Sequence, residues 1–257
     1  MSGEVVSAPP GSGLQPGDRV AAFTMLGGFA ELATAPAARV FTLPDGTSFE
    51  QGAALPLNYL TAWFALVQRG RMAPGESVLV HGAAGGVGSA AIQVAKAFGA
   101  GTVIAVTSTA EKGAVALAAG ADTYVLAESF LPDARVVLPS GVDLVVDPVG
   151  DDRVTDSLRC LRDDGRLLVI GFAGGEIPSV KVNRLLHNNI SVVGVGLGAY
   201  GVTRPQHTRE GWDAIVPRVG SGALDPVIGA TFSLDRAAEA LTLLDERRAV
   251  GKVLLTP

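Results

Sequence analysis

From Ser77 onward the chain alternates between two hydrophobic patterns. Continuous apolar runs at 77–82 and 102–108 are typical of strands buried on both faces of a sheet. Between and after them, apolar positions at helical spacing over 86–99 and 110–120 predict helices that end at glycine. This alternation predicts βαβ units and a parallel sheet covered on both faces. We expect further strands and one more helix, at 122–126, 142–147, 165–170 and 189–196 for the strands and 154–161 for the helix.

The two ends of the chain do not show this regular alternation of strand and helix patterns. A Pro- and Gly-rich stretch leads into a predicted strand at 19–24, and 27–44 reads as two short strands broken at Ala35-Pro36. A helix is predicted from Ser48 to Gly70, and 230–257 reads as a helix flanked by strands. We therefore expect β-rich material at both ends, with too little of it to close a barrel.

Composition narrows the class of protein. The 257 residues are 48% hydrophobic, which suits one or two domains with a large core. The net charge of −5 and the lack of a basic run argue against a nucleic-acid partner. A single cysteine, Cys160, excludes an intrachain disulfide and fits a reducing compartment. With no signal-peptide pattern and no run of roughly 18 apolar residues, a cytoplasmic protein without a membrane partner is predicted.

The loop after the first predicted strand carries a glycine signature. In the dinucleotide motif G-x-G-x-x-G, the first position here is Ala83, followed by Gly85 and Gly88. Backbone N–H groups at the start of the next helix would face a pyrophosphate, and the helix dipole favours its negative charge. The alternative is a tight turn without a ligand. Because the full strand, loop and helix context is present, we predict a dinucleotide site, with Ala83 tolerated if its φ stays negative.

The second strand favours NADPH over NADH. An NAD site usually has an acidic residue about twenty residues after the glycines, and none lies between Val87 and Ala110. Thr107, Ser108 and Thr109, with Lys112 nearby, would instead suit a 2′-phosphate. Helix capping by Ser108 or Thr109 is the alternative, and it is compatible with phosphate binding.

Other chemistries find little support. The three histidines lie far apart and no cysteine pair exists, so no zinc or other metal site is predicted. His81 is interpreted as structural and Cys160 as a core residue. No G-x-S-x-G motif supports a hydrolase.

The run "HGAAGGVGSAAIQVAKAFGA" (81–100), together with "PGDRVAAF", "GVDLVVDPVG" and "RRAVGKVLLTP", resembles the medium-chain dehydrogenase/reductase superfamily in its zinc-free quinone oxidoreductase branch. The resemblance extends over nearly the whole chain. It implies an α/β fold, with a Rossmann doubly wound parallel sheet and a GroES-like β-rich catalytic domain that is incomplete at its N-terminus. The domains implied are 1–55 for the catalytic part, 56–224 for the Rossmann domain, and 225–257 for the return into the catalytic domain.

The resemblance also implies site residues. Gly85, Gly86 and Val87 would lie along the pyrophosphate, and Ser108 and Lys112 near the 2′-phosphate. Residues around the nicotinamide would be Thr61, Gly171, Phe172, Ala173 and Lys252, although an ordinary surface lysine is the alternative for Lys252. One departure is Ala127, which stands where the family often has a tyrosine near the 2′-phosphate.

The function implied is NADPH-dependent transfer of hydride to a quinone or an α,β-unsaturated carbonyl, without zinc. Tyr59 is the candidate proton donor, against the alternative that it is a core aromatic. Two other readings stay open: an enoyl-thioester reductase, and a non-catalytic NADPH-binding protein such as a sensor or crystallin-like protein. The apolar, β-branched strand at 189–196 predicts a homodimer formed edge to edge.

Overall fold

The computed structural model of the chain describes residues 1–204 and 206–257. It divides into two compact units. The central unit is Thr61–Gly196, and the flanking unit combines Met1–Leu60 with Leu197–Pro257. The domain boundaries expected from the sequence stay a prediction, and each unit is described by itself.

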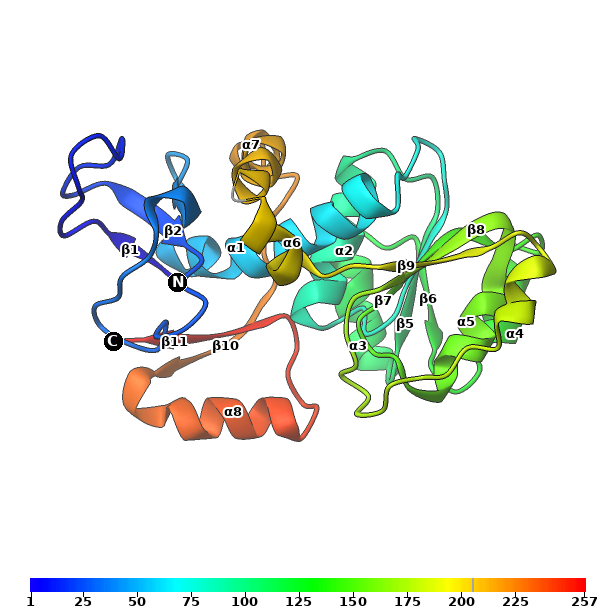
Figure 1. Cartoon of the computed structure of the whole chain (residues 1–257). Coiled ribbons are helices and arrows are strands. Elements are labelled where there is room, and N and C mark those ends of the chain that lie inside the picture. The colour runs from blue at the N-terminus through cyan, green and yellow to red at the C-terminus, as the bar shows by residue number, and fades with distance from the viewer. Residues whose placement is uncertain (205) are drawn as a thin grey trace. The chain divides into compact units, whose positions relative to one another are not determined.

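A six-stranded parallel sheet forms the central unit (Figure 1). Its strand order is β6-β5-β4-β7-β8-β9, so the first strand lies in the middle and the order reverses there. That is the doubly wound order of a Rossmann sheet, and the expected α/β class is confirmed. The strands are β4 (Val78–Val80), β5 (Val103–Thr107), β6 (Thr123–Leu126), β7 (Val142–Asp147), β8 (Leu161–Val169) and β9 (Ser191–Gly194).

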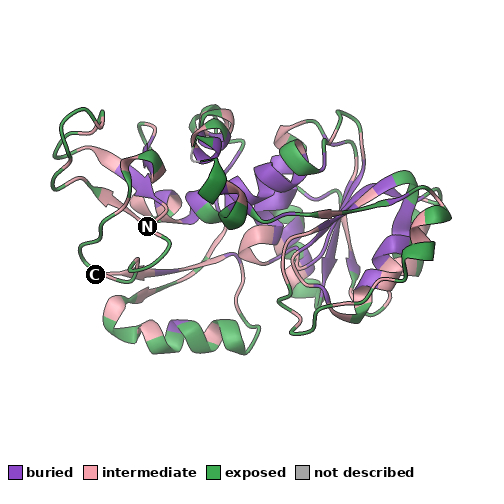
Figure 2. Cartoon of the chain, viewed as in Figure 1, coloured by how far each residue is buried: buried purple, intermediate pink, exposed green. Residues whose placement is uncertain are grey.

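Helices cover both faces of this sheet. α2 (Gly86–Ala97) and α3 (Ala110–Ala118) lie on one face, and α4 (Phe130–Val137) and α5 (Val154–Cys160) on the other (Figure 1). All residues of β4, β5 and β7 are buried, as the purple strands of Figure 2 show. This two-sided burial explains why these strands are continuous apolar runs rather than alternating ones.

The flanking unit contains two small sheets. β1 (Ser2–Glu4), β2 (Arg19–Ala22) and β3 (Val40–Thr42) form an antiparallel sheet, while β10 (Ile228–Ser233) and β11 (Lys252–Thr256) pair in parallel. Trp212 stacks on Phe41 with ring centroids 4.7 Å apart, which packs the helix His207–Gly220 against β3. The helices of this unit are α6 (Leu197–Thr203), α7 (His207–Gly220) and α8 (Ala237–Asp245), and α1 (Phe49–Trp63) begins in it.

The sequence predictions at the ends of the chain were partly wrong. No strand forms between Ala22 and Val40 in the described chain, because the first half of 27–44 pairs with no neighbouring strand and leaves Phe29 and Leu32 exposed. The predicted helix at 48–70 is α1 followed by a π-helical turn, Phe64–Arg69. The elements β1, α4, α6 and α7 were not predicted, since they are short or have weak periodicity.

Candidate cofactor site

The turns that follow β4, β5, β7 and β8 meet at one edge of the central sheet. Ala83 N donates to Val106 O (3.2 Å), which ties the turn after β4 to β5. Ile170 N donates to Asp147 O (2.9 Å), and Gly174 N donates to Val149 O (2.8 Å), so the turns after β7 and β8 are also joined. Parallel strands bring their carboxyl ends together, and ligands of open α/β sheets bind at that edge where the order reverses.

The glycine turn after β4 has little room for side chains. Gly82 has a φ of +58°, in the left-handed region that favours glycine. A Cβ added to Gly88 would overlap the carbonyl oxygen of Gly82, so α2 can approach the turn this closely only with glycine there. Ala83 does not have a positive φ, which confirms the condition for its tolerance in the first position of the motif. Gly82 is therefore needed for its backbone conformation and Gly88 for the close approach of α2, whereas Ala83 meets neither constraint.

The start of α2 offers amide groups to an anion. Its N-cap is Gly85, which has no side chain to accept hydrogen bonds from the first turn. A Cβ at Gly85 would lie 3.3 Å from Gly82 O, so the backbone is also compact at this point. Gly86 and Val87 follow in the first turn and are half-buried. A backbone cradle of this kind at a helix N-terminus fits the pyrophosphate of a dinucleotide.

The three hydroxyl residues at the end of β5, Thr107, Ser108 and Thr109, have different contacts. Thr107 is buried and its hydroxyl donates to Thr109 O (3.1 Å). Thr109 is the N-cap of α3, and its hydroxyl accepts from Lys112 N (3.3 Å). Ser108 between them is exposed. Capping therefore occurs through Thr109, whereas the exposed Ser108 does not cap α3.

An acidic residue at this turn was missed by the sequence reasoning. Glu111 lies in the first turn of α3, one residue beyond the acid-free interval. Hydrogen bonds from its own backbone and from the Thr109 hydroxyl lower the pKa of Glu111. Its negative charge is held at the helix N-terminus and opposes the positive charge of Lys112 beside it.

The turn after β8 carries the residues assigned to the nicotinamide. Ala173 N donates to Pro148 O (3.1 Å), which fixes this turn against the one after β7. Phe172 is 42% exposed, and a Cβ at Gly150 would lie 2.9 Å from its ring, so the two turns pack directly. Gly171 lies beside Pro148 O. Thr61, the first residue of the central unit, is buried in α1.

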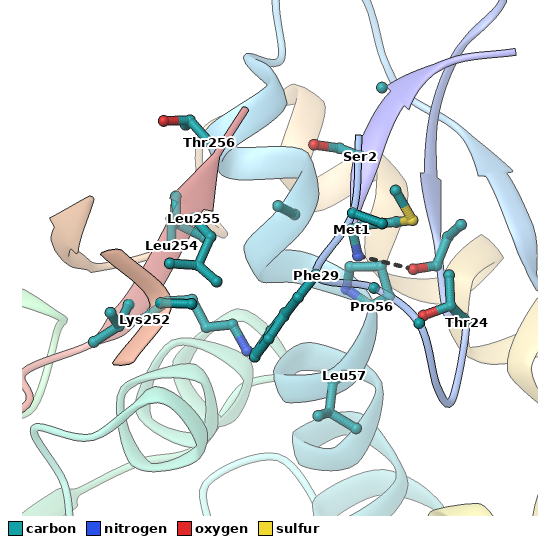
Figure 3. Close-up of a pocket in the computed structure, with 18 of the residues that line it drawn as sticks. Met1, Ser2, Thr24, Phe29, Pro56, Leu57, Lys252, Leu254, Leu255 and Thr256 are labelled. Carbon is teal, nitrogen blue, oxygen red and sulfur yellow. Dashed lines mark hydrogen bonds between the residues drawn. The ribbon is translucent and has the colours of Figure 1, made fainter. Parts of the chain in front are cut away.

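Tyr59 and Lys252 belong to the flanking unit. Tyr59 is only 2% exposed, and burial, with a further contribution from the charge of Asp225, raises the pKa of its phenol. Lys252 extends from β11 into an apolar pocket of about 880 Å³ (Figure 3), and burial lowers the pKa of its amine. Phe29, Leu57, Leu241 and Leu254 also line this pocket.

Within the described part of the chain, no three His, Cys, Asp or Glu residues lie together as metal ligands would. Burial raises the pKa of Cys160 to about 12, so its thiol is not a reactive nucleophile at neutral pH. None of the described helices combines the length and apolar character needed to cross a membrane.

Comparison with known proteins agrees with this geometry. A family model described as zinc-binding dehydrogenase matches residues 86–217. Quinone oxidoreductase-like protein 2 of Bos taurus is 36% identical over 248 residues, covering 95% of this chain and 71% of that protein.

Two solved structures extend the likeness to three dimensions. A probable oxidoreductase from Mycobacterium abscessus is 39% identical with a TM-score of 0.89, covering 100% of this chain and 78% of that one. The Escherichia coli quinone oxidoreductase, solved in complex with NADPH, is 30% identical with a TM-score of 0.88. The match covers 100% of this chain and 80% of that one.

Proposed function

Because the chain belongs to the medium-chain dehydrogenase/reductase superfamily and has quinone oxidoreductase-like relatives, we propose that it is a zinc-independent, NADPH-dependent oxidoreductase. Its substrate would be a small electrophile, a quinone or an α,β-unsaturated carbonyl. The observation that carries the proposal is the glycine cradle, where Gly88 lets α2 approach Gly82 and the N-cap Gly85 offers no side chain to the first amides of α2.

The choice of NADPH follows from the end of β5. Ser108 stands where an NAD enzyme would carry a carboxylate, and an exposed hydroxyl can donate to a 2′-phosphate that a carboxylate would repel. Lys112 supplies positive charge in the same turn. Glu111 works against this charge, so we expect a preference for NADPH rather than absolute exclusion of NADH. The NADPH complex of the Escherichia coli relative supports the same choice.

When bound, NADPH supplies a hydride to the electrophilic carbon of the substrate. The residues of the chain would hold and orient it: Gly85, Gly86 and Val87 through backbone amides at the pyrophosphate, and Thr107, Ser108 and Lys112 at the ribose end. Gly171, Phe172 and Ala173, joined to the turn after β7, would form the wall at the nicotinamide, with Thr61 as a further contact.

The substrate oxygen that becomes negative must take up a proton. We propose that the proton comes from water, because the candidate donor Tyr59 is almost fully buried and its pKa is raised. A Tyr59→Phe variant tests this directly. We expect its kcat to stay within about twofold of the unaltered chain, since general acid catalysis contributes about 10² to 10⁴. A loss of that larger size would make Tyr59 the donor.

The proposed function is tested by cofactor binding and turnover. Titration with NADPH and NADH should show tighter binding of NADPH, and 1,4-benzoquinone should oxidise NADPH in the presence of the chain. A Ser108→Asp variant should lose NADPH affinity by about tenfold or more and shift its preference to NADH, because two negative groups then meet.

The matched control is Ser140→Asp, an exposed serine just before β7 at the opposite edge of the same sheet. It should leave both affinities unchanged. Oxidation of NADPH by a crotonyl thioester but not by the quinone would identify an enoyl-thioester reductase. Tight NADPH binding without turnover of any acceptor would identify a non-catalytic binding protein, and no NADPH binding would overturn the proposal.

A further inference from the structure

A buried polar cluster lies directly beneath the cofactor turns. His81, Asp147 and Ser157 are 0%, 1% and 0% exposed. β4 and β7 pair in parallel with Val80 opposite Val146, and His81 N, just after β4, donates to Val146 O (3.0 Å). His81 and Asp147, the last residue of β7, therefore project from the same face of the sheet. α5, which carries Ser157, packs against β7 on that face. The cluster thus joins residues that are distant in sequence.

Hydrogen bonding determines where the ring proton of His81 lies. The Ser157 hydroxyl donates its only hydrogen to Arg153 O (2.9 Å). Nε2 of His81 lies 2.8 Å from the same hydroxyl oxygen, so Nε2 must be the donor in that contact. Burial lowers the pKa of His81 to about 4, with the Asp147 charge opposing and Arg153 assisting, so the ring is neutral at pH 7. Nδ1 is therefore a bare acceptor.

Asp147 presents a second acceptor. Its Oδ1 accepts from Val149 N and Gly150 N, both at 2.9 Å, and so shapes the turn after β7. Its Oδ2 is buried and accepts no hydrogen bond from the protein, as is true of His81 Nδ1. Two acceptors cannot satisfy each other. A molecule with two donor hydrogens can satisfy both, and buried water commonly has this role.

We propose that one buried water bridges His81 Nδ1 and Asp147 Oδ2, and that this link positions the two turns that face the cofactor. Gly82 directly follows His81, and a Cβ at Gly82 would lie 3.2 Å from Val149 of the turn that Asp147 shapes. The spacing of His81 and Asp147 therefore controls how the glycine turn meets the turn after β7. His81 and Asp147 are positioning residues, and the expected effect on NADPH affinity rests on the proposed function.

The water link is tested first without cofactor. The chain has three histidines, so a ¹⁵N-labelled sample gives few ring signals, and the signal missing in a His81→Gln variant identifies His81. We expect the Nε2–H tautomer with the Nδ1 shift of a nitrogen that accepts a hydrogen bond. A protonated Nδ1, which would pair directly with Asp147, or an Nδ1 shift without a hydrogen bond, would each overturn the link.

A double-mutant cycle on NADPH affinity tests the positioning role. His81→Gln keeps a donor for Ser157 but removes the Nδ1 acceptor, and Asp147→Asn keeps Oδ1 but puts a donor in place of the Oδ2 acceptor, so in either variant the water can no longer donate to both His81 Nδ1 and Asp147 Oδ2. Each variant should raise the Kd for NADPH by about tenfold, and the double variant should add little more, because both remove the same link. Additive losses would mean two independent residues and would overturn the proposal.

The matched control is Ser77→Ala at the other end of the same strands, where the serine hydroxyl donates to buried Asp143 (2.7 Å). It should lower thermal stability and leave the NADPH Kd within about twofold, since it lies far from the cofactor edge. An equal loss of NADPH affinity in Ser77→Ala would mean that the effects at His81 and Asp147 come from lost stability, and it would overturn their positioning role. If NADPH failed to bind the unaltered chain, the proposed function and the affinity effect would fall together, while the ¹⁵N result would still decide the water link.

Discussion

At the residue scale, the absence of a Cβ atom at Gly88 allows the glycine turn after β4 to form. It is buried in the first turn of α2, and no side chain fits between its backbone and Gly82 O. Gly85, three residues earlier, has an N-cap geometry with φ −81° that any residue can adopt, and a Cβ there would be only slightly crowded. The two glycines of the motif are therefore not equivalent.

A Gly88→Ala variant should lose stability by about 1–3 kcal/mol, because the new methyl group forces α2 away from the turn. The same shift should weaken NADPH binding by at least about tenfold, since the first amides of α2 move with the helix. Urea unfolding and an NADPH titration measure the two effects.

Gly220→Ala is the control for this variant, because an added Cβ at the end of α7 meets no atom within 4 Å. It should be unchanged or slightly more stable, as helix propensity favours alanine by up to about 1 kcal/mol. A Gly88→Ala chain as stable as the Gly220→Ala chain would refute the steric argument.

At the scale of elements, the central sheet ends in two edge strands, β9 and β6. β9 ends the sheet on one side and pairs only with β8 among the described strands, and β6 ends it on the other. Val192 on β9 is 39% exposed, and Val182 and Leu186 in the preceding segment are exposed as well. An unpaired edge with apolar side chains is a template for a second strand. The homodimer expected from the sequence stays a prediction for this edge.

A Val192→Lys variant should convert the dimer to monomers, because a charge on an edge strand opposes pairing with its copy. Size-exclusion chromatography with light scattering measures the mass in solution. Leu126→Lys on β6, where the leucine is 42% exposed, is the matched control and should stay dimeric. If the unaltered chain ran as a monomer at all concentrations, the edge-to-edge dimer would be excluded.

At the scale of the whole molecule, the chain folds into a continuous unit and a unit made from both ends. The central unit is one uninterrupted stretch, whereas the flanking unit joins residues from the first and last sixty or so positions. The proposed cofactor residues of the turns all lie in the central unit, so cofactor binding should stabilise that unit directly.

Cys160 can report whether cofactor binding stabilises the central unit. It is the only cysteine, lies buried in α5 of the central unit, and has a pKa raised to about 12. A thiol reagent should therefore label it only when the central unit opens. NADPH at about 100 times its Kd should slow labelling by up to about 100-fold, the factor expected for a ligand that binds only the folded state.

The comparison is with NADH at the same concentration, which should protect less. Labelling in urea should be fast and insensitive to either nucleotide. If NADPH bound but left the labelling rate unchanged, the cofactor would not stabilise the unit that holds Cys160.

The sequence alone determined the parts that depend on local chemistry. Apolar runs such as 102–108 predicted strands buried on both faces, and glycines 85 and 88 predicted the turn, because burial and backbone freedom are properties of each segment. The alternation of strands and helices was then enough to predict a parallel sheet. These predictions needed no knowledge of distant neighbours.

The tertiary structure decided what depends on partners remote in the chain. The segment near Phe29 has the composition of a strand but no neighbour to pair with, while β10 and β11 find each other in parallel. Three hydroxyl residues at and after the end of β5 looked alike in sequence, and only the fold buried Thr107, made Thr109 the N-cap of α3 and left Ser108 exposed. The pairing of β4 with β7 placed His81 beside Asp147, because register between strands is set by packing across the whole sheet and is not encoded in either strand alone.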